Sequence, residues 1–568
     1  MKNPQELKRL VLSIRQSKTA AEERKVIEQE KAQIRSEMSN KKLKQDRKML
    51  NVSKLILIDM LGHDSSFAYF ECIRLICEND YKSKKIGYLG ISSLCTKSPD
   101  ILIMCTSQLT RDLGSDNKDI ISLALCTAAN IADTTILVCL QPHIVGLFTH
   151  KDNVIKYRAI AAAIALIRIC PETIQDVLSN INEVLMESSS TVFRSITVLF
   201  VDILKISNQH KRQISLFVQL VCSNFCRIIQ QRSSDGVADP IGVVQYLRLL
   251  IFFADELSET CIGQLVDTSK VLGAGTKSSI KYEMAHLFLK TKNTFLNQYG
   301  NNILTSFVHS VNSNLRYCGL KLSNVIADWD KNKLKIVVNL EQCLSDANVE
   351  IRNLALSLSS KLINEENVQT MLKSYLNCLM SVNNSLHNHI VEKIADALNF
   401  PNIDPVWYLD TVIRACILAP YIPDTMIYGC INLIRTTESI QEFATKKLFY
   451  AINSGFRQNA LPCLSFWSIG EHPNYIDELE LKNFIEKMVD EPLNNTHIMY
   501  LVTMSLKVGL KVRNIKNSCI FVLSHFSFSE DTEVSQRASE YLIILSEFAD
   551  SKFRNLLNES GSNTRVLE

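Results

Sequence analysis

Apolar residues recur at intervals of three and four along most of the chain, which is the spacing of one face of an α-helix. In DANVEIRNLALSLSSKLI, for example, Ile351, Leu354, Ala355 and Leu358 fall on one helical face. No segment alternates apolar and polar residues as a half-buried strand would, and prolines fall between the helical segments. The pattern predicts an all-α protein.

The helical segments also repeat at a nearly constant interval. A polar turn and a cation precede an apolar helix around Lys118, Lys156 and Arg194, which are 38 residues apart, and around Arg316 and Arg352, which are 36 apart. A period near 40 with two helices per unit is typical of HEAT or armadillo-like repeats, in which no unit can bury its apolar face alone. We therefore expect an α-solenoid of such repeats.

The segment KKIGYLGISSL places Gly87 and Gly90 three residues apart on one face of a predicted helix. Each glycine costs about 1 kcal/mol relative to alanine in a helix, so the pair needs a physical reason. A phosphate-binding loop would require Lys-Ser or Lys-Thr at a helix N-terminus, and none follows. We predict that the glycines let a neighbouring helix come close.

Composition indicates the compartment. The 17 cysteines stand singly in apolar runs, which predicts buried thiols in a reducing environment such as the cytosol. The chain has no uncharged apolar stretch of 18 residues and no apolar signal-peptide core at its start. We expect a soluble protein.

Candidate chemistry is sparse. Cys222 and Cys226 lie one helical turn apart and could supply two metal ligands, but a zinc site needs four and no second pair is near in the sequence. Neither the histidines nor the paired carboxylates form a motif that would shift a pKa or hold an ion. The sequence predicts no metal, no cofactor and no enzymatic activity.

The charge is concentrated at the N-terminus. Residues 1–54 contain 15 Lys and Arg against 7 Asp and Glu, whereas the remainder contains 47 against 52. The pattern predicts a long amphipathic helix through LKRLVLSIRQSKTAAEERKVIEQEKAQIRSEM, followed by a basic cluster. Without interleaved aromatics, the cluster favours an anionic membrane over nucleic acid, although charge alone fits a solvated helix face equally well. The cluster consists of Lys41, Lys42, Lys44, Arg47, Lys48 and Lys54.

A family resemblance adds to this picture. In chain order, the segments KKIGYLGISSLCTKSPDI, LALCTAANIAD, DGVADPIGVVQYLRLL and FWSIGEHPNYIDE resemble the trunk of the large adaptin subunits of clathrin adaptor complexes. Asp239 and Pro240, and the set Trp467, Gly470 and Glu471, resemble the gamma type most. The epsilon type shares the second set, so an epsilon or alpha adaptin, or a HEAT-repeat scaffold outside the adaptors, stays an alternative.

The resemblance implies a domain organisation. Residues 1–558 correspond to an adaptin trunk and residues 559–568 to a short polar tail, and the hinge and ear of typical gamma-adaptins are expected to be absent. The segment LLNES from Leu556 echoes a clathrin-binding box only in part and more simply ends a helix.

The resemblance also implies partners. We expect a heterotetramer with beta-adaptin, a medium (mu) chain and a small (sigma) chain, acting in vesicle transport between the trans-Golgi network and endosomes. An Arf-family GTPase would help to recruit the complex, and clathrin would be contacted indirectly, through the beta chain.

Two sites follow from the same resemblance. Arg15 matches the position that helps bind the acidic residue of acidic dileucine cargo signals, and the alternative is a solvent-facing arginine. The cluster Lys41, Lys42, Lys44, Arg47, Lys48 and Lys54 falls where related chains bind phosphoinositide, here phosphatidylinositol 4-phosphate, and the alternative is a solvated loop.

Overall fold

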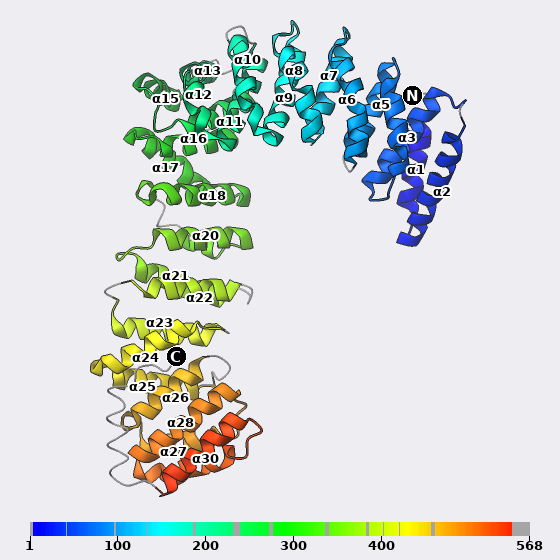
Figure 1. Cartoon of the computed structure of the whole chain (residues 1–568). Coiled ribbons are helices and arrows are strands. Elements are labelled where there is room, and N and C mark those ends of the chain that lie inside the picture. The colour runs from blue at the N-terminus through cyan, green and yellow to red at the C-terminus, as the bar shows by residue number, and fades with distance from the viewer. Residues whose placement is uncertain are drawn as a thin grey trace. The chain divides into compact units, whose positions relative to one another are not determined.

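The computed structural model describes residues 4–40, 42–95, 98–131, 133–185, 189–230, 239–271, 276–334, 340–381, 386–400, 403–419, 421–455 and 460–547. The predicted polar tail, residues 559–568, lies outside these ranges. The chain divides into two compact units, Met1–Gly300 and Asn301–Glu568. The described residues of both units contain helices and no strands, as Figure 1 shows.

Unit 1 begins with three helices and continues as helical hairpins that lie side by side in chain order (Figure 1). Its helices are α1 (Pro4–Gln16), α2 (Ala20–Met38), α3 (Gln45–Met60), α4 (Tyr69–Cys77), α5 (Tyr81–Ser93), α6 (Pro99–Leu113), α7 (Lys118–Asn130), α8 (Thr134–Gly146), α9 (Asn153–Ile169), α10 (Ile174–Leu185), α11 (Ser190–Ile206), α12 (Lys211–Ser215), α13 (Val218–Gln230), α14 (Pro240–Phe252), α15 (Glu259–Val271) and α16 (Ser278–Lys290).

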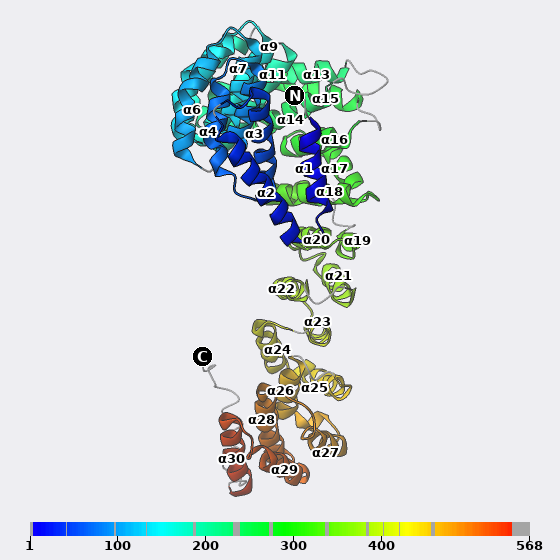
Figure 2. The same cartoon turned by 90° about the vertical axis from the view of Figure 1, so that its right-hand side faces the viewer.

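Helix α17 comprises Thr294–Val308. Within unit 2, helical hairpins again lie side by side in chain order in both views (Figure 2). The helices of unit 2 are α18 (Ser313–Asp330), α19 (Leu340–Leu344), α20 (Val349–Leu362), α21 (Val368–Ser381), α22 (His387–Leu398), α23 (Pro405–Leu418), α24 (Asp424–Thr436), α25 (Glu438–Asn453), α26 (Leu461–Glu471), α27 (Glu478–Lys487), α28 (Asn495–Lys511), α29 (Lys516–Phe526) and α30 (Thr532–Glu547).

The predicted repeat is confirmed. The cation-bearing segments form every second helix, and these helices pack against one another: α7 on α9 on α11 in unit 1, and α18 on α20 in unit 2. The polar turns before them are N-caps, because Asp152, Asn312 and Asn348 accept hydrogen bonds from backbone amides of the first turn. The expected α-solenoid of HEAT-like hairpins is therefore the observed fold.

Ion pairs connect neighbouring repeats. The Nη2 atom of Arg168 lies 2.6 Å from a carboxylate oxygen of Asp202, and the Nε atom of Arg248 lies 2.7 Å from one of Glu283. The partners are 34 and 35 residues apart, about one repeat. Such pairs, each with one largely exposed partner, contribute little energy individually, but they align one hairpin on the next.

The apolar faces merge into a continuous core. In unit 1 a single cluster of buried side chains extends from Ile27 to Leu296. Thirteen of the seventeen cysteines are buried and all are free thiols, which agrees with the predicted use of cysteine as a small apolar residue. Among the described residues, every helix is too short or too polar to cross a membrane.

The two glycines of α5 confirm the predicted close packing. A Cβ atom built on Gly87 would lie 2.9 Å from both the carbonyl oxygen of Cys72 and the backbone nitrogen of Ile76, and one on Gly90 would lie 2.5 Å from the sulfur of Cys72. Helix α4 therefore occupies the space that larger residues on α5 would need.

A buried ion pair lies beside this contact and joins α5 to α6. Lys84 and Asp112, 3% and 5% exposed, are joined by Nζ–Oδ distances of 2.8 and 2.9 Å, and the Lys84 Nζ also donates to the carbonyl oxygen of Ile76. The Tyr88 hydroxyl donates to a carboxylate oxygen of Asp112 at 2.6 Å, and burial raises the pKa of Tyr88. This network joins α4, α5 and α6 through groups that need one another to remain buried.

Substitution of Gly87 tests this packing. Gly87→Ala places a methyl group against backbone atoms that cannot rotate away, so we expect a loss of about 1–3 kcal/mol of stability. Gly263→Ala is the matched control, because a Cβ atom there meets nothing within 4 Å, and it should gain about 0.4–1 kcal/mol. Thermal unfolding followed by circular dichroism measures both, and equal stability of the two variants would contradict the packing argument.

Candidate functional site

The basic N-terminal segment forms three helices, so the prediction of one long amphipathic helix is wrong. The chain breaks between α1 and α2, where Thr19 caps α2 by accepting a hydrogen bond from the amide of Glu22 at 3.2 Å. The Glu22 carboxylate in turn accepts from the amide of Lys18 at 2.8 Å. The sequence TAAE carries this capping pattern, so it could have indicated the break.

Arg15 lies in the last turn of α1, directly before this break, and its side chain is exposed. It forms no ion pair with any residue in the described ranges. Glu6, which faces α3, precedes it by nine residues, or about 14 Å along the helix axis. The structure therefore places Arg15 and the contact of α1 with α3 at different ends of α1.

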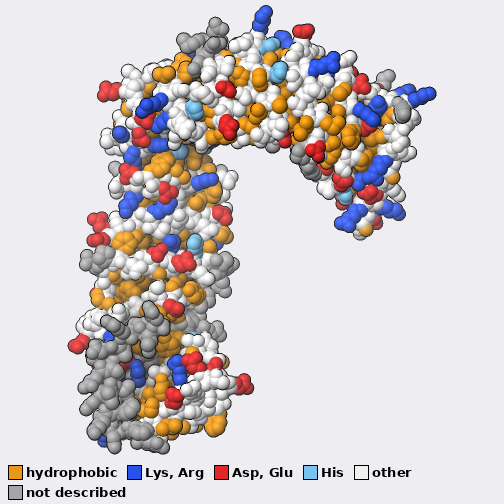
Figure 3. Space-filling view, in the orientation of Figure 1, with side chains coloured by type: hydrophobic (Ala, Val, Ile, Leu, Met, Phe, Trp, Pro, Cys, Tyr) orange, Lys and Arg blue, Asp and Glu red, His pale blue; other side chains and the backbone are white. Residues whose placement is uncertain are grey.

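The basic cluster divides into two groups of cations. Lys42 and Lys44 are exposed and Lys48 is half-buried at the start of α3, and no ion pair ties any of these three to another described residue. Lys41 lies outside the described residues. Figure 3 shows Lys and Arg side chains gathered over the end of the unit that α1, α2 and α3 form.

Arg47 is predicted to bind phosphoinositide, but its guanidinium is already paired with carboxylates of the same chain. Its Nη2 and Nε atoms donate to the two carboxylate oxygens of Glu37 at 2.7 and 2.8 Å, and its Nη1 donates to Glu6. The hydrogen bonds from Arg47 lower the pKa of Glu37 to about 2 and raise the pKa of Arg47. The guanidinium serves to join the three helices.

The prediction that Lys54 binds phosphoinositide also needs correction, because this residue is only 4% exposed. Its Nζ atom lies 2.6 Å from a carboxylate oxygen of Glu30 and 3.7 Å from one of Glu6. A lysine buried against two carboxylates joins α3 to α2 and α1, and it presents no charge to a membrane. Among the described residues of the cluster, Lys42, Lys44 and the half-buried Lys48 are therefore the cations that reach solvent.

The sequence analysis missed the carboxylates that bind these cations, although a signal was present. Glu30 and Glu37 are seven residues apart on α2, and Arg47 and Lys54 are seven residues apart on α3. Residues seven apart share one helical face, so two consecutive helices that run antiparallel can pair Glu37 with Arg47 and Glu30 with Lys54. A count of net charge over the segment does not reveal these pairs, because it ignores which residues share a helical face.

Cys222 and Cys226 are buried on α13, and the described parts of the chain contain no group of three or more His, Cys, Asp or Glu residues placed to hold a metal ion. The Thr268 hydroxyl donates to the Cys226 sulfur at 3.2 Å. These thiols are packed in the interface between α13 and α15.

Comparison with known proteins gives the family. The family model of the adaptin N-terminal region matches residues 23–548, which is nearly the whole chain. The chain belongs to the adaptin family. This adaptin is 27% identical to the AP-1 complex subunit gamma of Dictyostelium discoideum over 82% of its own length and 53% of that protein. It is 28% identical to AP-1 complex subunit gamma-1 of Mycosarcoma maydis over 95% of its own length and 65% of that protein.

The predicted resemblance to gamma-type adaptins is thus confirmed. The adaptin spans about half to two thirds of the length of these relatives. Its fold matches a chain in a homology model of the full-length AP-3 complex with a TM-score of 0.60 and 17% identity, covering 91% of this chain and 99% of that one. At that identity the likeness shows the helical solenoid fold alone.

The Glu37–Arg47 pair predicts a pH dependence of stability. Because the pKa of Glu37 falls from 4.5 to about 2 in the folded state, its ionised form stabilises that state above pH 4.5, and this contribution is lost as the pH falls toward 2. Glu37→Gln should therefore lower the unfolding temperature at pH 7, with a difference that narrows below pH 4.5. The control Glu78→Gln, at an exposed site, should change little at either pH. A difference for Glu37→Gln that is constant down to pH 3 would contradict the ion-pair explanation.

Proposed function

We propose that this adaptin is the large gamma-type subunit of a heterotetrameric, clathrin-associated adaptor complex that selects cargo between the trans-Golgi network and endosomes. One observation carries the proposal: the adaptin model covers residues 23–548, and the relatives along that length are named AP-1 gamma subunits. The role is structural and recognitive, and we propose no catalytic step.

Assembly with other adaptor chains is the first part of this function. Unit 1 presents exposed apolar side chains on α5 and α6, including Leu89, Ile103 and Met104. Exposed apolar groups favour partner chains when they gather on a surface. We propose that unit 1 holds a small sigma chain and that beta and mu chains complete the complex.

Co-expression tests assembly. We expect low solubility for this chain alone and a stable complex when beta, mu and sigma chains are co-expressed with it, measured by size-exclusion chromatography with light scattering. A monodisperse monomer that ignores all three partners would reject the proposal.

Cargo recognition is the second part, and it concerns Arg15. The side chain is exposed at the end of α1 and unengaged by other described residues. A guanidinium binds a carboxylate with two parallel hydrogen bonds, so we propose that it helps to bind the acidic residue of acidic dileucine signals.

Charge reversal tests this site. In the assembled complex, Arg15→Glu should weaken binding of an acidic dileucine peptide by roughly tenfold or more, because a lost charged hydrogen bond is worth about 1.5–3 kcal/mol. Binding of a tyrosine-based peptide should not change. Arg9→Glu, an equal reversal at another exposed position of α1, should leave both peptides unaffected. Equal loss of both peptides would indicate misfolding or a different site.

Membrane binding is the third part. We propose that Lys42, Lys44 and Lys48 contact phosphatidylinositol 4-phosphate, with an Arf-family GTPase as the second contact. Each cation near an anionic leaflet contributes about 1 kcal/mol, so three give a weak contact that needs a partner for stable docking.

Liposome co-sedimentation of the complex tests the lipid contact. Lys42→Glu, Lys44→Glu and Lys48→Glu together should reduce binding to liposomes containing this lipid by roughly 100-fold, the equivalent of about 3 kcal/mol. The control makes the same change of charge at exposed positions of unit 2, with Lys482→Glu, Lys487→Glu and Arg513→Glu. Lys54→Glu is unsuitable, because it would bury three carboxylates together and unfold α1–α3. Unchanged binding of the first variant at physiological salt would reject the lipid contact.

A further inference from the structure

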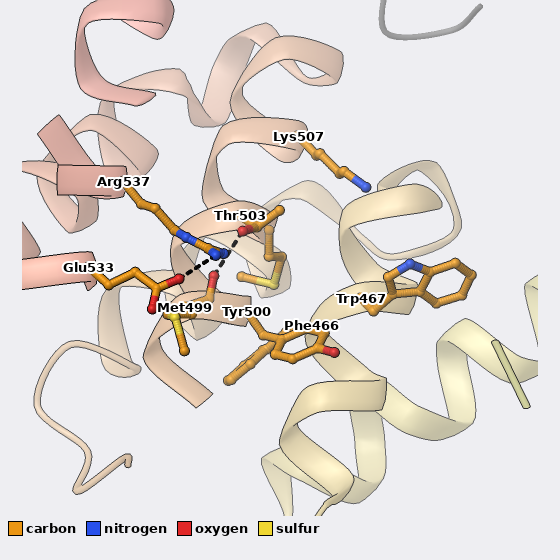
Figure 4. A pocket seen from close by; sticks show the side chains of 9 residues that line it. Phe466, Trp467, Met499, Tyr500, Thr503, Lys507, Glu533 and Arg537 are labelled. Carbon is orange, nitrogen blue, oxygen red and sulfur yellow. Dashed lines mark hydrogen bonds and ion pairs between the residues drawn. The ribbon is translucent and has the colours of Figure 1, made fainter. Parts of the chain in front are cut away.

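Unit 2 contains a cavity of about 320 Å³ among α26, α28 and α30. Its floor is apolar and buried, formed by Phe466 and Met504, which are 0% and 1% exposed. Half-buried Trp467, Met499 and Tyr500 line its walls. Figure 4 shows Trp467 of α26 across the cavity from the α30 side chains, with Phe466 and Tyr500 between them.

The charged groups of this cavity stand at its rim. Arg537 and Glu533 of α30 form an ion pair with an Nη2–Oε1 distance of 2.5 Å. Lys507 of α28 pairs with Glu471 of α26, which also lies 3.4 Å from Lys511. A cavity with an apolar floor and charges of both signs at its edge suits an apolar side chain whose flanking residues are charged.

Of the sequence set that indicated the gamma type, Trp467 lines this cavity, and Gly470 and Glu471 lie where α26 meets α28. A Cβ atom on Gly470 would lie only 3.3 Å from the Cα atom of Met504, so the glycine lets α26 approach α28 closely. Glu471 joins the same two helices through Lys507 and Lys511. Trp467 precedes this close contact by one turn and lines the opening.

We propose that the cavity binds this chain's own C-terminal segment, residues 548–568, through Phe553, Leu556 and Leu557. These residues are spaced i, i+3 and i+4, so one helical turn would bring all three to one face. The segment lies outside the described residues, and in the sequence it follows directly on α30, whose Glu533 and Arg537 line the cavity.

The covalent connection supports this occupant. Helix α30 ends at Glu547, ten residues after Arg537, which is about 15 Å along the helix axis. Five extended residues, 548–552, span about 17 Å, so a chain that reverses after Glu547 brings Phe553 level with Arg537. A tethered segment acts at a high effective concentration, so even a modest contact is occupied.

Charge complementarity supports it as well. Asp550 and Glu559 flank the apolar residues and suit Lys507 and Arg537, whereas Lys552 and Arg554 suit Glu533. The segment carries equal numbers of Lys or Arg and Asp or Glu side chains, so nothing repels it from a rim with both signs.

Photo-cross-linking in the full chain tests the proposal. A benzoylphenylalanine in place of Phe553 should cross-link within the same chain to Met499 or Met504, as identified by mass spectrometry, because this probe reacts with nearby C–H bonds and both methionines line the cavity. The same probe in place of Asn563, beyond the apolar residues, should give at least tenfold less of this product.

A substitution in the cavity wall provides the second measurement. Thr503→Arg places a long cation in the cavity and should reduce the Phe553 cross-link at least tenfold, whereas Gln536→Arg, at an exposed position of α30, should not. Thr503→Arg could also disturb folding, so a third measurement avoids this substitution. In it, a peptide of residues 548–568 is titrated against the chain ending at Glu547, and its binding affinity is measured. The Phe553→Ala peptide should bind at least tenfold more weakly.

The outcomes separate the possible occupants. The proposal is supported if the probe cross-links to Met499 or Met504, if Thr503→Arg reduces this cross-link, and if the peptide binds. Cross-links to a co-purified adaptor chain, cross-links elsewhere in this chain, or a peptide that does not bind would overturn it. Capture of another chain's segment in the cavity would assign the cavity to that partner.

Discussion

The helices of each hairpin pack on each other and bury the rest of their apolar faces against the next hairpin, so packing between neighbouring repeats holds each unit together. Helices α7, α9 and α11 show this arrangement in unit 1, and α18 and α20 show it in unit 2. Ion pairs such as Arg168–Asp202 repeat at the same interval and align the hairpins. Because this stability comes from neighbours in the sequence, the outer surfaces are left for recognition.

The packing is tightest where side chains are smallest. At Gly87 the backbone of α4 approaches α5, and beside it Lys84 of α5 donates to the Ile76 carbonyl oxygen of α4 while it pairs with Asp112 of α6. At Gly470 the backbone of α28 approaches α26, and Glu471 of α26 pairs with Lys507 of α28 beside that contact. In both places a glycine allows close approach, and a charged side chain beside it forms a hydrogen bond to the neighbouring helix.

The N-terminal helices show how packing limits function. Three carboxylates of α1 and α2 bind two cations of α3, so a segment with a large excess of positive charge presents only part of it to solvent. A charge that joins helices cannot also bind a membrane, since breaking a buried pair leaves an uncompensated charge. The candidate lipid site therefore consists of the cations at the start of α3, and the candidate cargo site of Arg15 stands apart from it.

The sequence by itself determined the helical class, the repeat near 40 residues, the role of the α5 glycines and the adaptin family, because periodicity and short motifs are local properties of a chain. It also contained the cap at Thr19 and the matched seven-residue spacings of Glu30 with Glu37 and Arg47 with Lys54. Only the tertiary structure decided that Lys54 is buried, that Arg47 is bound, and that Trp467 lines a cavity shared with α30. These facts depend on which helices meet, and contacts between residues far apart in the sequence are set by packing rather than by local pattern.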